Sequence, residues 1–380
     1  MTAAGFDPAE FRSLFPALKN FVYLNTPTAP PGSLPVLDAL RRAETTWEEG
    51  AFTWRGWEDE AQDTRPLFGK LIGAAPESVA LLTSLSEAAA TVALSLSGTG
   101  RVVVAEHEFR SNLWPWLTLR ERGFEVVRIP TVDGVVSTDA YVEAVTPGTR
   151  LVAISAVQSF NGYRVDLAPI AERAREVDAR LFLNLTQMLG ALTFDVEEIR
   201  PDYVAAHGYK WMLCPRGAAW LYVRPDRLES MTPLAPNWKS AADPHASYYG
   251  GDLDLSRSAS RLDSSLPWFS WVGAKAALQL LLSLDRRAVE QRCLELAAAF
   301  RGGASERGFV CVPEEHPSHI VGLEIDDPAA LHERLERRNV VASVRGGGLR
   351  LGFHAFNDES DVEAGLDALG REAGELGETV

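Results

Sequence analysis

Short apolar runs that alternate with stretches of helical spacing fill the middle of the chain. The runs are nearly continuous in apolar residues, which is typical of strands that are buried on both faces of a sheet. Strands that alternate with helices form a largely parallel sheet with helices covering both faces, so we predict an α/β fold. The seven predicted strands are Val79 to Thr83, Arg101 to Ala105, Phe124 to Pro130, Leu151 to Val157, Arg180 to Leu185, Tyr203 to Ala206 and Ala218 to Val223.

The C-terminal part of the chain has a different pattern, with short strands and helices that indicate a small α+β unit. We predict a large α/β domain over residues 20–255 and a small α+β domain made of residues 1–19 and 256–380. The predicted strands outside the large sheet are Phe21 to Thr26, Ile320 to Ile325, Val340 to Val344 and Leu349 to Phe353. The predicted helices are Leu34 to Trp47, Asp59 to Ile72, Ser86 to Leu96, Asn112 to Arg122, Thr138 to Ala144, Leu167 to Val177, Val272 to Leu284, Ala288 to Arg301, Pro328 to Arg338 and Ser360 to Glu372.

Composition argues against several classes of partner and site. The net charge of −15 is spread along the sequence without a run of Lys or Arg, so neither nucleic acid nor a membrane is an expected partner. Three distant cysteines fit neither a disulfide framework nor a zinc site and indicate a reducing cytoplasm. The start lacks a secretory signal, and no apolar run reaches the roughly 18 residues of a membrane helix. No metal is predicted, since neither His107 nor His207 has a partner at metal-ligand spacing.

Polar residues follow several predicted strands, at the edge where ligands bind on parallel sheets. Ser86, Glu87 and Ala88 follow the strand that starts at Val79 and open a predicted helix. Free N–H groups at a helix start bind anions, although an ordinary serine N-cap gives the same pattern. The glycine-rich loops of dinucleotide and P-loop sites are absent from the sequence. The strand ends therefore predict a ligand site of another kind.

Lys210 lies between two apolar runs and beside aromatic residues, and it is one of only five lysines in the chain. Burial lowers the pKa of an ammonium group, so the free amine becomes available near neutral pH as a nucleophile for a carbonyl. The alternative is a solvated lysine at the end of a strand. The residues around Lys210 decide between these two interpretations.

Six motifs lie along the chain in the order Tyr23-Leu24-Asn25-Thr26; Glu108-Phe109-Arg110-Ser111-Asn112 with Trp114-Pro115-Trp116; Gly162-Tyr163-Arg164-Val165-Asp166-Leu167; Asn184-Leu185-Thr186-Gln187; Tyr209-Lys210-Trp211 with Pro215-Arg216-Gly217; and Leu349-Arg350-Leu351 with His354-Ala355-Phe356-Asn357. Together they resemble the class V group of fold-type I pyridoxal-phosphate enzymes, which includes cysteine desulfurases and isopenicillin-N-epimerase-like proteins. No single motif is decisive, but their order matches over nearly the whole chain. The resemblance implies a fold-type I architecture and pyridoxal 5'-phosphate as the cofactor.

The resemblance also implies roles for individual residues. Lys210 would hold the cofactor as a Schiff base and later move protons at the substrate α-carbon. Gln187 would hydrogen-bond the phenolic oxygen of the cofactor, and Phe109 would stack on its ring. Arg350 would bind the substrate carboxylate, a task that suits a planar guanidinium, unless it is a surface arginine. The other expected contacts are Ser86, Glu87, Ala88, His207 and Tyr209 to the phosphate, Gln158 and Asn184 to the rest of the cofactor, and Asn25 and Thr26 to the substrate.

Asn184 departs from the family pattern, which usually has Asp at this place. A carboxylate there keeps the pyridine nitrogen of the cofactor protonated and makes the ring an electron sink. Asn can hydrogen-bond the nitrogen but supplies no charge. We therefore expect a carbanion that is less delocalised into the ring, which disfavours full transamination, unless the site has lost its activity.

Two further departures concern the contacts around the cofactor. Ser159 stands where desulfurases have an Asn near the cofactor oxygen, so Gln158 or Ser159 is expected to replace that contact. Leu266 stands near the place from which relatives send a Thr across a dimer to the phosphate. Either Ser264 or Ser265 takes over this contact, or the contact is missing.

These observations lead us to expect a homodimer with its active site at the subunit interface. The enzyme would act on an amino acid or related amine through an external aldimine and α-deprotonation, with epimerisation, amino transfer or lyase cleavage as the outcome. A carbon–sulfur lyase or cysteine desulfurase is one alternative. The persulfide route is disfavoured, because no cysteine follows Val321 and Cys214 is interpreted as structural. A non-catalytic protein that keeps the fold is the other alternative, and Asn184 favours it.

Overall fold

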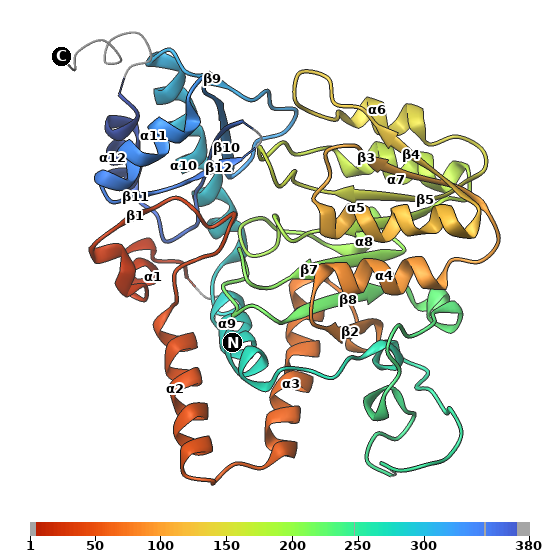
Figure 1. The fold of residues 1–380 in the computed structure, drawn as a ribbon. Helices are drawn as coiled ribbons and strands as arrows, with labels where there is room; N and C mark the ends of the chain where they lie inside the picture. The colour runs from red at the N-terminus through yellow and green to blue at the C-terminus, as the bar shows by residue number, and fades with distance from the viewer. Residues whose placement is uncertain (1–4, 247, 346, 371–380) are drawn as a thin grey trace.

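The computed structural model describes residues 5–246, 248–345 and 347–370, and a seven-stranded sheet lies at its centre (Figure 1). The strand order is β2-β8-β7-β6-β5-β3-β4, in which β8 runs antiparallel to both neighbours and the other pairs are parallel. The prediction of seven strands in a mainly parallel sheet is confirmed. The strands are β2 (Val79–Leu82), β3 (Gly100–Ala105), β4 (Phe124–Ile129), β5 (Thr149–Ser155), β6 (Arg180–Asn184), β7 (Tyr203–His207) and β8 (Ala219–Val223).

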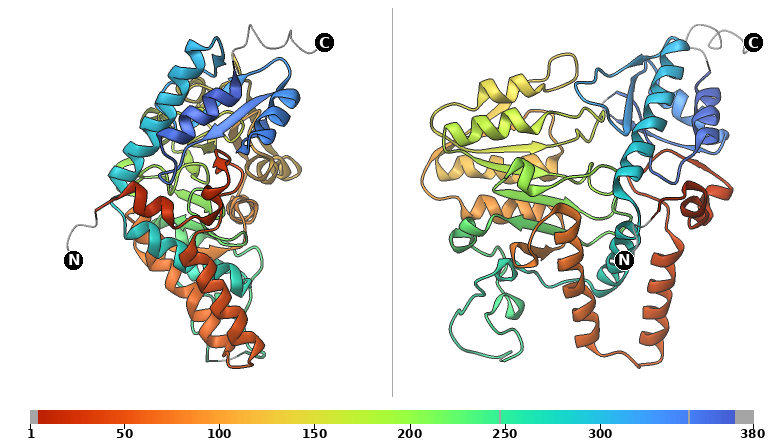
Figure 2. Two further views of the ribbon diagram at one scale, coloured as in Figure 1. Left: turned by 90° about the vertical axis from the view of Figure 1, so that its left-hand side faces the viewer. Right: turned by 180° about the vertical axis from the view of Figure 1, so that it is seen from behind.

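Helices cover both faces of this sheet, which is why its strands are apolar throughout. In β3, Val103 packs in one core with Ile170, whereas Val102 and Val104 pack in a second core with Trp116. The helices of the second core cross the sheet in front in Figure 1, and those of the first core are seen from behind in Figure 2. They are α4 (Leu85–Ser95) and α5 (Arg110–Leu117) in front, and α6 (Thr138–Ala144) and α7 (Leu167–Glu176) behind.

The C-terminal unit is built on a four-stranded antiparallel sheet with the order β12-β13-β10-β9. It has its own core, to which Phe300 and Leu335 contribute. A parallel pair of β1 and β11 ties the start of the chain to this unit. The elements are β1 (Val22–Tyr23), β9 (Val310–Cys311), β10 (Ile320–Glu324), β11 (Val340–Val341), β12 (Ser343–Arg345), β13 (Gly348–Gly352), α11 (Pro328–Arg337) and α12 (Glu359–Leu369).

Several elements differ from their predicted bounds. The strand predicted over 340–344 is two strands, because β11 pairs with β1 whereas β12 pairs with β13. Helix α3 (Trp54–Ile72) begins before the predicted Asp59, since the Thr53 hydroxyl caps it by accepting a hydrogen bond from the N–H of Gly56 at 3.1 Å. The last predicted helix ends at Leu369, and residues 371 and 372 of that prediction lie outside the described residues. The sequence pattern does not predict α1 (Pro8–Ser13), α8 (Val196–Ile199) or β9.

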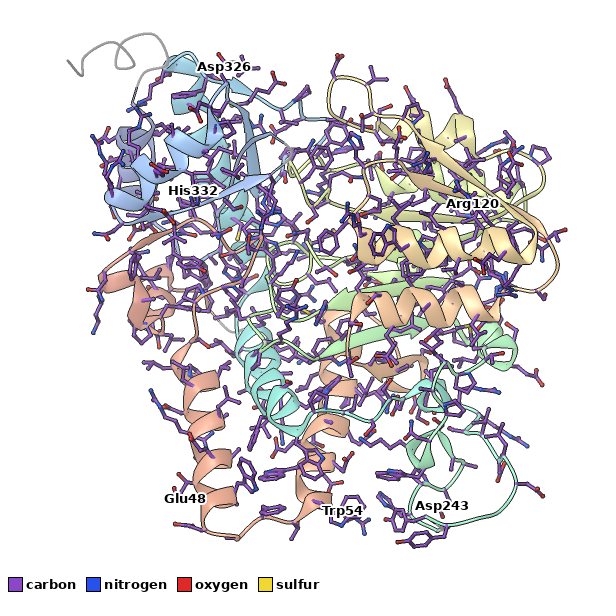
Figure 3. The ribbon with its side chains drawn as sticks, viewed as in Figure 1. Glu48, Trp54, Arg120, Asp243, Asp326 and His332 are labelled. Carbon is purple, nitrogen blue, oxygen red and sulfur yellow. The ribbon has the colours of Figure 1, made fainter. Side chains whose placement is uncertain are left out.

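Helices α2 and α3 form an arm that extends from the body of the molecule (Figure 1). Figure 3 shows Glu48 and Trp54 near the end of this arm, where the Trp54 ring meets the ring of Trp238 edge-on at 5.6 Å. Helix α9 packs against both helices of the arm, although it comes after the predicted domain boundary near residue 255. That boundary stays a prediction.

In the described part of the chain, no helix is long and apolar enough to cross a membrane. The remaining helices are α2 (Leu34–Glu48), α9 (Trp268–Leu282) and α10 (Arg286–Glu306).

A buried carboxylate, Asp263, joins three segments of the large unit. Its side chain is 1% exposed, and its Oδ2 lies 2.5 Å from Nη2 of Arg65 on α3. Its Oδ1 accepts a hydrogen bond of 2.9 Å from the N–H of Leu81 on β2. The next residue, Ser264, donates a hydrogen bond to Glu87 near the start of α4. The Asp263 contacts therefore also fix the position of that helix start.

Replacing Asp263 with Ala should lower the free energy of unfolding by about 3–5 kcal/mol, because it leaves the Arg65 guanidinium without its buried partner. Urea denaturation followed by circular dichroism measures this loss. Asp63→Ala is the matched control, since Asp63 lies on α3 like Arg65, is 58% exposed and forms an ion pair with Lys275. The control should cost less than about 1 kcal/mol, and equal losses in both variants would contradict the role of Asp263.

Candidate active site

The carboxyl ends of the central strands and the start of α4 surround one cleft. Of the residues predicted for the site, the cleft brings together Ser86, Phe109, Asn184, Gln187, His207, Tyr209 and Lys210. Residues of the cleft that the sequence does not predict as contacts are Ser84, Leu85, Ser111, Thr186 and Arg216, with Ser159 left open as an alternative to Gln158.

The turn after β7 carries Lys210. The N–H of Leu213 donates to the carbonyl of Lys210 at 3.0 Å, and the N–H of Cys214 donates to the carbonyl of Gly208 at 3.1 Å. Leu213 has a φ of 60°, a conformation that costs energy for a residue other than glycine. The neighbouring turn passes close by, since a Cβ at Gly190 would lie 2.1 Å from the carbonyl oxygen of Trp211. The backbone around Lys210 is therefore tightly fixed.

Lys210 is buried, with 6% of its surface exposed. Its Nζ lies 5.5 Å from the ring centroid of Phe109 and 5.7 Å from that of Tyr209. None of the described carboxylates forms an ion pair with it. Burial, together with the positive charges of Arg350 and Arg345, lowers the pKa of Lys210 to about 7. The interpretation of Lys210 as a solvated surface lysine does not agree with this environment.

The start of α4 and the end of β7 form a positively polarised end of the cleft. Ser84 caps α4 by accepting a hydrogen bond from the N–H of Glu87 at 3.2 Å, and its Oγ lies 3.1 Å from Oγ of Ser86. Nε2 of buried His207 has no hydrogen-bond partner among the described residues. Burial and the nearby Arg216 lower the pKa of His207 to about 4, so the imidazole is neutral at neutral pH. Helix N–H groups beside an unpaired ring nitrogen suit an anion.

Arg216 and Thr186 are contacts that sequence reasoning misses. The Arg216 guanidinium lies 5.5 Å from the ring centroid of Tyr209. The Thr186 hydroxyl accepts a hydrogen bond from the N–H of His207 at 3.1 Å. Thr186 precedes Gln187 in its motif, and Arg216 follows Lys210 in the same motif, so the sequence does place both near the site. Neighbouring positions in a sequence do not tell which side chains face the cleft.

Glu87 and Ala88, both predicted to contact the phosphate, are not among the cleft residues. The Glu87 carboxylate accepts hydrogen bonds from the N–H and hydroxyl of Thr83, at 2.8 and 2.6 Å, and from the hydroxyl of Ser264. Ala88 packs in the core between α4 and the sheet. Their backbone N–H groups remain near the helix start, and the predicted phosphate contact stays a prediction.

Gln187 is held by three neighbours. Its amide nitrogen donates to the carbonyl of Pro27 and to the hydroxyl of Ser159, both at 3.0 Å, and its oxygen accepts from Nε1 of Trp211 at 2.8 Å. Ser159 thus has its own hydroxyl hydrogen free to donate into the cleft. Gln158 is buried and is not among the cleft residues, so Ser159 is the better placed of the two expected replacements.

Arg350 is almost fully buried, with 2% of its surface exposed. It donates to the carbonyl of Ser159, to the hydroxyl of Thr28 at 2.8 Å and to the hydroxyl of Ser343 at 3.3 Å. No described acid pairs with it, and burial together with Arg345 lowers the pKa of its guanidinium to about 9. An unpaired buried cation beside the cleft is suited to a carboxylate.

Asn25 and Thr26, which the sequence predicts as substrate contacts, are not among the residues that line the cleft. The Thr26 side chain is fully buried, and neither Oδ1 of Asn25 nor Oγ1 of Thr26 has a hydrogen-bond partner among the described residues. Thr28, two residues on, is the residue of this segment that contacts Arg350. The predicted substrate contacts of Asn25 and Thr26 stay predictions.

No three His, Cys, Asp or Glu side chains in the described ranges are grouped so as to hold a metal ion. The cleft itself contains a lysine, an arginine and several hydrogen-bonding groups. The cleft holds an amine with a pKa of about 7 and a place for an anion at the start of α4, and Arg350, which is not among the cleft residues, bonds to the carbonyl of the cleft residue Ser159. Such a cleft can form a carbonyl adduct with a phosphorylated aldehyde and hold a carboxylate nearby.

Curated relatives match nearly the whole chain. "Uncharacterized aminotransferase YcbU" of Bacillus subtilis is 28% identical over 378 residues, which cover 95% of this chain and 97% of that protein. Isopenicillin N epimerase of Streptomyces clavuligerus is 27% identical over 336 residues, which cover 82% of this chain and 84% of that protein.

Solved structures have the same fold, and one family model matches most of the chain. A cysteine desulfurase from Thermococcus onnurineus has a TM-score of 0.84 at 18% identity and covers 97% of this chain and 98% of its own. A structure of C-DES with glycine covalently linked to the PLP cofactor has a TM-score of 0.86 at 19% identity and covers 94% of this chain and 98% of its own. The Aminotransferase class-V family matches residues 55–364. The protein is therefore an enzyme of the class V aminotransferase family, whose members use pyridoxal phosphate.

Proposed function

We propose that this enzyme binds pyridoxal 5'-phosphate around Lys210 and removes a proton from the α-carbon of an amino acid or a related amine. The observation that carries this proposal is the environment of Lys210, which is buried without a carboxylate partner among the described residues and has a pKa of about 7. Condensation with an aldehyde needs the neutral amine. A lysine with the ordinary pKa of about 10.4 would be almost fully protonated at neutral pH.

The cleft fits the cofactor at both of its ends. At one end, the start of α4 and the unpaired Nε2 of His207 suit a phosphate. Beside Lys210, the ring of Phe109 is 49% exposed and is available to stack on an aromatic ligand. Asn184 and Ser159 also line the cleft and supply further hydrogen-bonding groups for the cofactor.

Pyridoxal phosphate supplies an electron sink for the electron pair that remains when the α-proton leaves. Nζ of Lys210 accepts that proton and can return it. Arg350 binds the substrate carboxylate, which orients the α-carbon towards Lys210. Return of the proton to the other face of the α-carbon would give epimerisation, and its transfer to the cofactor carbon would give amino transfer. Loss of a leaving group from the β-carbon would give elimination.

A carbon–sulfur lyase is the second candidate, and the state of the cysteines limits how it would work. Cys214 and Cys293 are buried, and burial raises the pKa of both thiols. Cys311 lies on β9 in the C-terminal unit. A persulfide on a cysteine of this chain is therefore disfavoured, and sulfur would leave on a thiol from outside the chain.

We propose that the enzyme is a cytoplasmic homodimer with its active site at the subunit interface. Aromatic residues remain exposed on the arm, with Trp47 57% and Trp54 40% exposed, which supports an interface there. Ser264 is engaged by Glu87 of its own chain, which leaves the exposed Ser265 to reach the phosphate of the partner. The three cysteines are free, in keeping with a reducing compartment.

Without cofactor, labelling of Lys210 by trinitrobenzenesulfonate should rise with pH around a midpoint of about 7. The reagent reacts with the neutral amine, and this amine predominates once the pH exceeds the pKa. Peptide mass spectrometry measures the label on Lys210, and Lys210→Ala is the blank. Arg350→Gln should move the midpoint to higher pH, since it removes a positive charge that disfavours the ammonium form. A midpoint near the value of about 10.4 for a free lysine side chain would contradict the proposed environment.

Purified protein given pyridoxal phosphate should gain a visible absorption band that Lys210→Ala lacks. Lys275→Ala is the matched control, because Lys275 lies in an exposed ion pair on α9 and should leave the band unchanged. Amino acids that act as substrates should change the band, and chiral chromatography with keto-acid and sulfide assays then identifies the product. A wild-type protein that stays colourless with added cofactor would rule out both candidate functions.

A further inference from the structure

Two buried side chains connect the cleft to the carboxyl group of a third, Glu108, which lies behind it. Nδ2 of Asn184 donates a hydrogen bond of 2.8 Å to Oγ of Ser155. Oγ of Ser155 donates a hydrogen bond of 2.8 Å to Oε1 of Glu108, and the N–H of Ser155 donates to Oε2 at 3.2 Å. Asn184, Ser155 and Glu108 are at most 5% exposed, and Asn184 lines the cleft together with Lys210.

The direction of these hydrogen bonds is fixed by their backbone partners. The N–H of Thr186 donates to Oδ1 of Asn184 at 3.0 Å, so the amide oxygen must face Thr186 and the amide nitrogen must face Ser155. Because Oγ of Ser155 accepts from that nitrogen, its own hydrogen is directed to Glu108. Each member of the chain therefore donates towards the carboxylate.

Hydrogen-bond donors surround the Glu108 carboxyl group and favour its ionised form. One of its oxygens accepts the N–H of Phe109 at 2.7 Å and the other accepts the N–H of Ser155 at 3.2 Å. Backbone N–H groups can only donate, so both oxygens act as acceptors. Burial raises the pKa of Glu108, and the hydrogen bonds from Ser155 and Phe109 oppose this rise. No described Lys or Arg pairs with Glu108, so a negative charge on its carboxyl group would act on the hydrogen-bonded chain.

We propose that Glu108 is a positioning residue that supplies, through Ser155, the negative charge that Asn184 lacks towards the ring nitrogen of the cofactor. This inference rests on the proposed function, because it requires pyridoxal phosphate in the cleft with its ring nitrogen at Asn184. A charge that polarises a chain of hydrogen bonds in a medium of low dielectric keeps much of its effect at the far end. A protonated ring nitrogen would donate to the second lone pair of Oδ1 of Asn184, and a charge on Glu108 would favour this form without a carboxylate in the cleft.

The test is Glu108→Gln, which keeps the size of the side chain and removes its charge. In the wild-type holoenzyme, cofactor labelled with 15N in the ring should give a solid-state NMR resonance in the range of a protonated pyridine. In the variant, this resonance should move towards the unprotonated range, and the cofactor should dissociate with a Kd about tenfold higher. Glu106→Gln is the matched control, since Glu106 lies two residues away, is 38% exposed and pairs with Arg128. Glu106→Gln should change neither quantity.

Two further variants separate charge from structure. Ser155→Ala breaks the chain without removing the Glu108 charge and should change the resonance in the same direction, so it carries the test if Glu108→Gln fails to fold. Asn184→Asp places a carboxylate at the cleft, and in that background Glu108→Gln should no longer shift the resonance.

The possible results distinguish this inference from the proposed function. A wild-type protein that does not bind pyridoxal phosphate would overturn both. Cofactor that binds through Lys210 with an unprotonated ring nitrogen in the wild type would overturn this inference alone. The inference also fails if Glu108→Gln lowers the melting temperature but leaves the 15N resonance in place, because Glu108 would then be only structural.

Discussion

The parallel register of β5, β6 and β7 is the constraint on which the site depends. Ser155 pairs with Asn184, so the last residues of β5 and β6 meet at one edge of the sheet, and Asn184 pairs with Ala205, two residues before the end of β7. Both faces of these strands are buried, and polar side chains are tolerated only where the strands end and partners are available. A shift of one residue in β6 would turn Asn184 to the other face of the sheet and remove it from the cleft.

The charge distribution at this edge explains which ligands the cleft accepts. Lys210 and Arg350 are both buried without a carboxylate partner among the described residues, and the pKa of each is lowered, chiefly by burial. Buried cations without partners are costly, so the apoprotein stores energy that an anion can release. A phosphate at the start of α4 and a carboxylate at Arg350 would supply two such anions. The environment that makes the Lys210 amine reactive therefore also favours binding of the molecules with which it reacts.

The sequence allows the sheet to be predicted more fully than the site. Near-continuous apolar runs indicate strands that are buried on both faces, and the burial of Val102, Val103 and Val104 agrees with that pattern. A motif tells which residues come close to a helix start, but it does not tell where their side chains point. Ser86 reaches the cleft, whereas the Glu87 carboxylate turns to Thr83 and Ser264.

Contacts between distant segments were the other part that could not be predicted. Thr28 meets Arg350 across 322 positions of the chain, and Glu108 meets Ser155 across 47 positions. Both contacts depend on how the segments after the strands fold over the sheet. The family resemblance pointed to Phe109, which does line the cleft, whereas the buried acid Glu108 gives no signal until its donors are known.

Asn184 indicates either an active site with changed chemistry or a site that has lost its activity. The energetics of the surrounding residues favour the first interpretation. A buried carboxylate such as Glu108 is stable only while its donors hold it, and an apolar side chain of similar size would often serve the core as well or better. A protein that no longer needed the cleft would be free to replace Glu108, Lys210 and Arg350 with apolar residues at no cost to its function. The chain nevertheless has all three at buried positions: Lys210 in the cleft, Arg350 bonded to the carbonyl of the cleft residue Ser159, and Glu108 behind Asn184. The arrangement is the one expected if the charge has moved from the cleft to the core behind it.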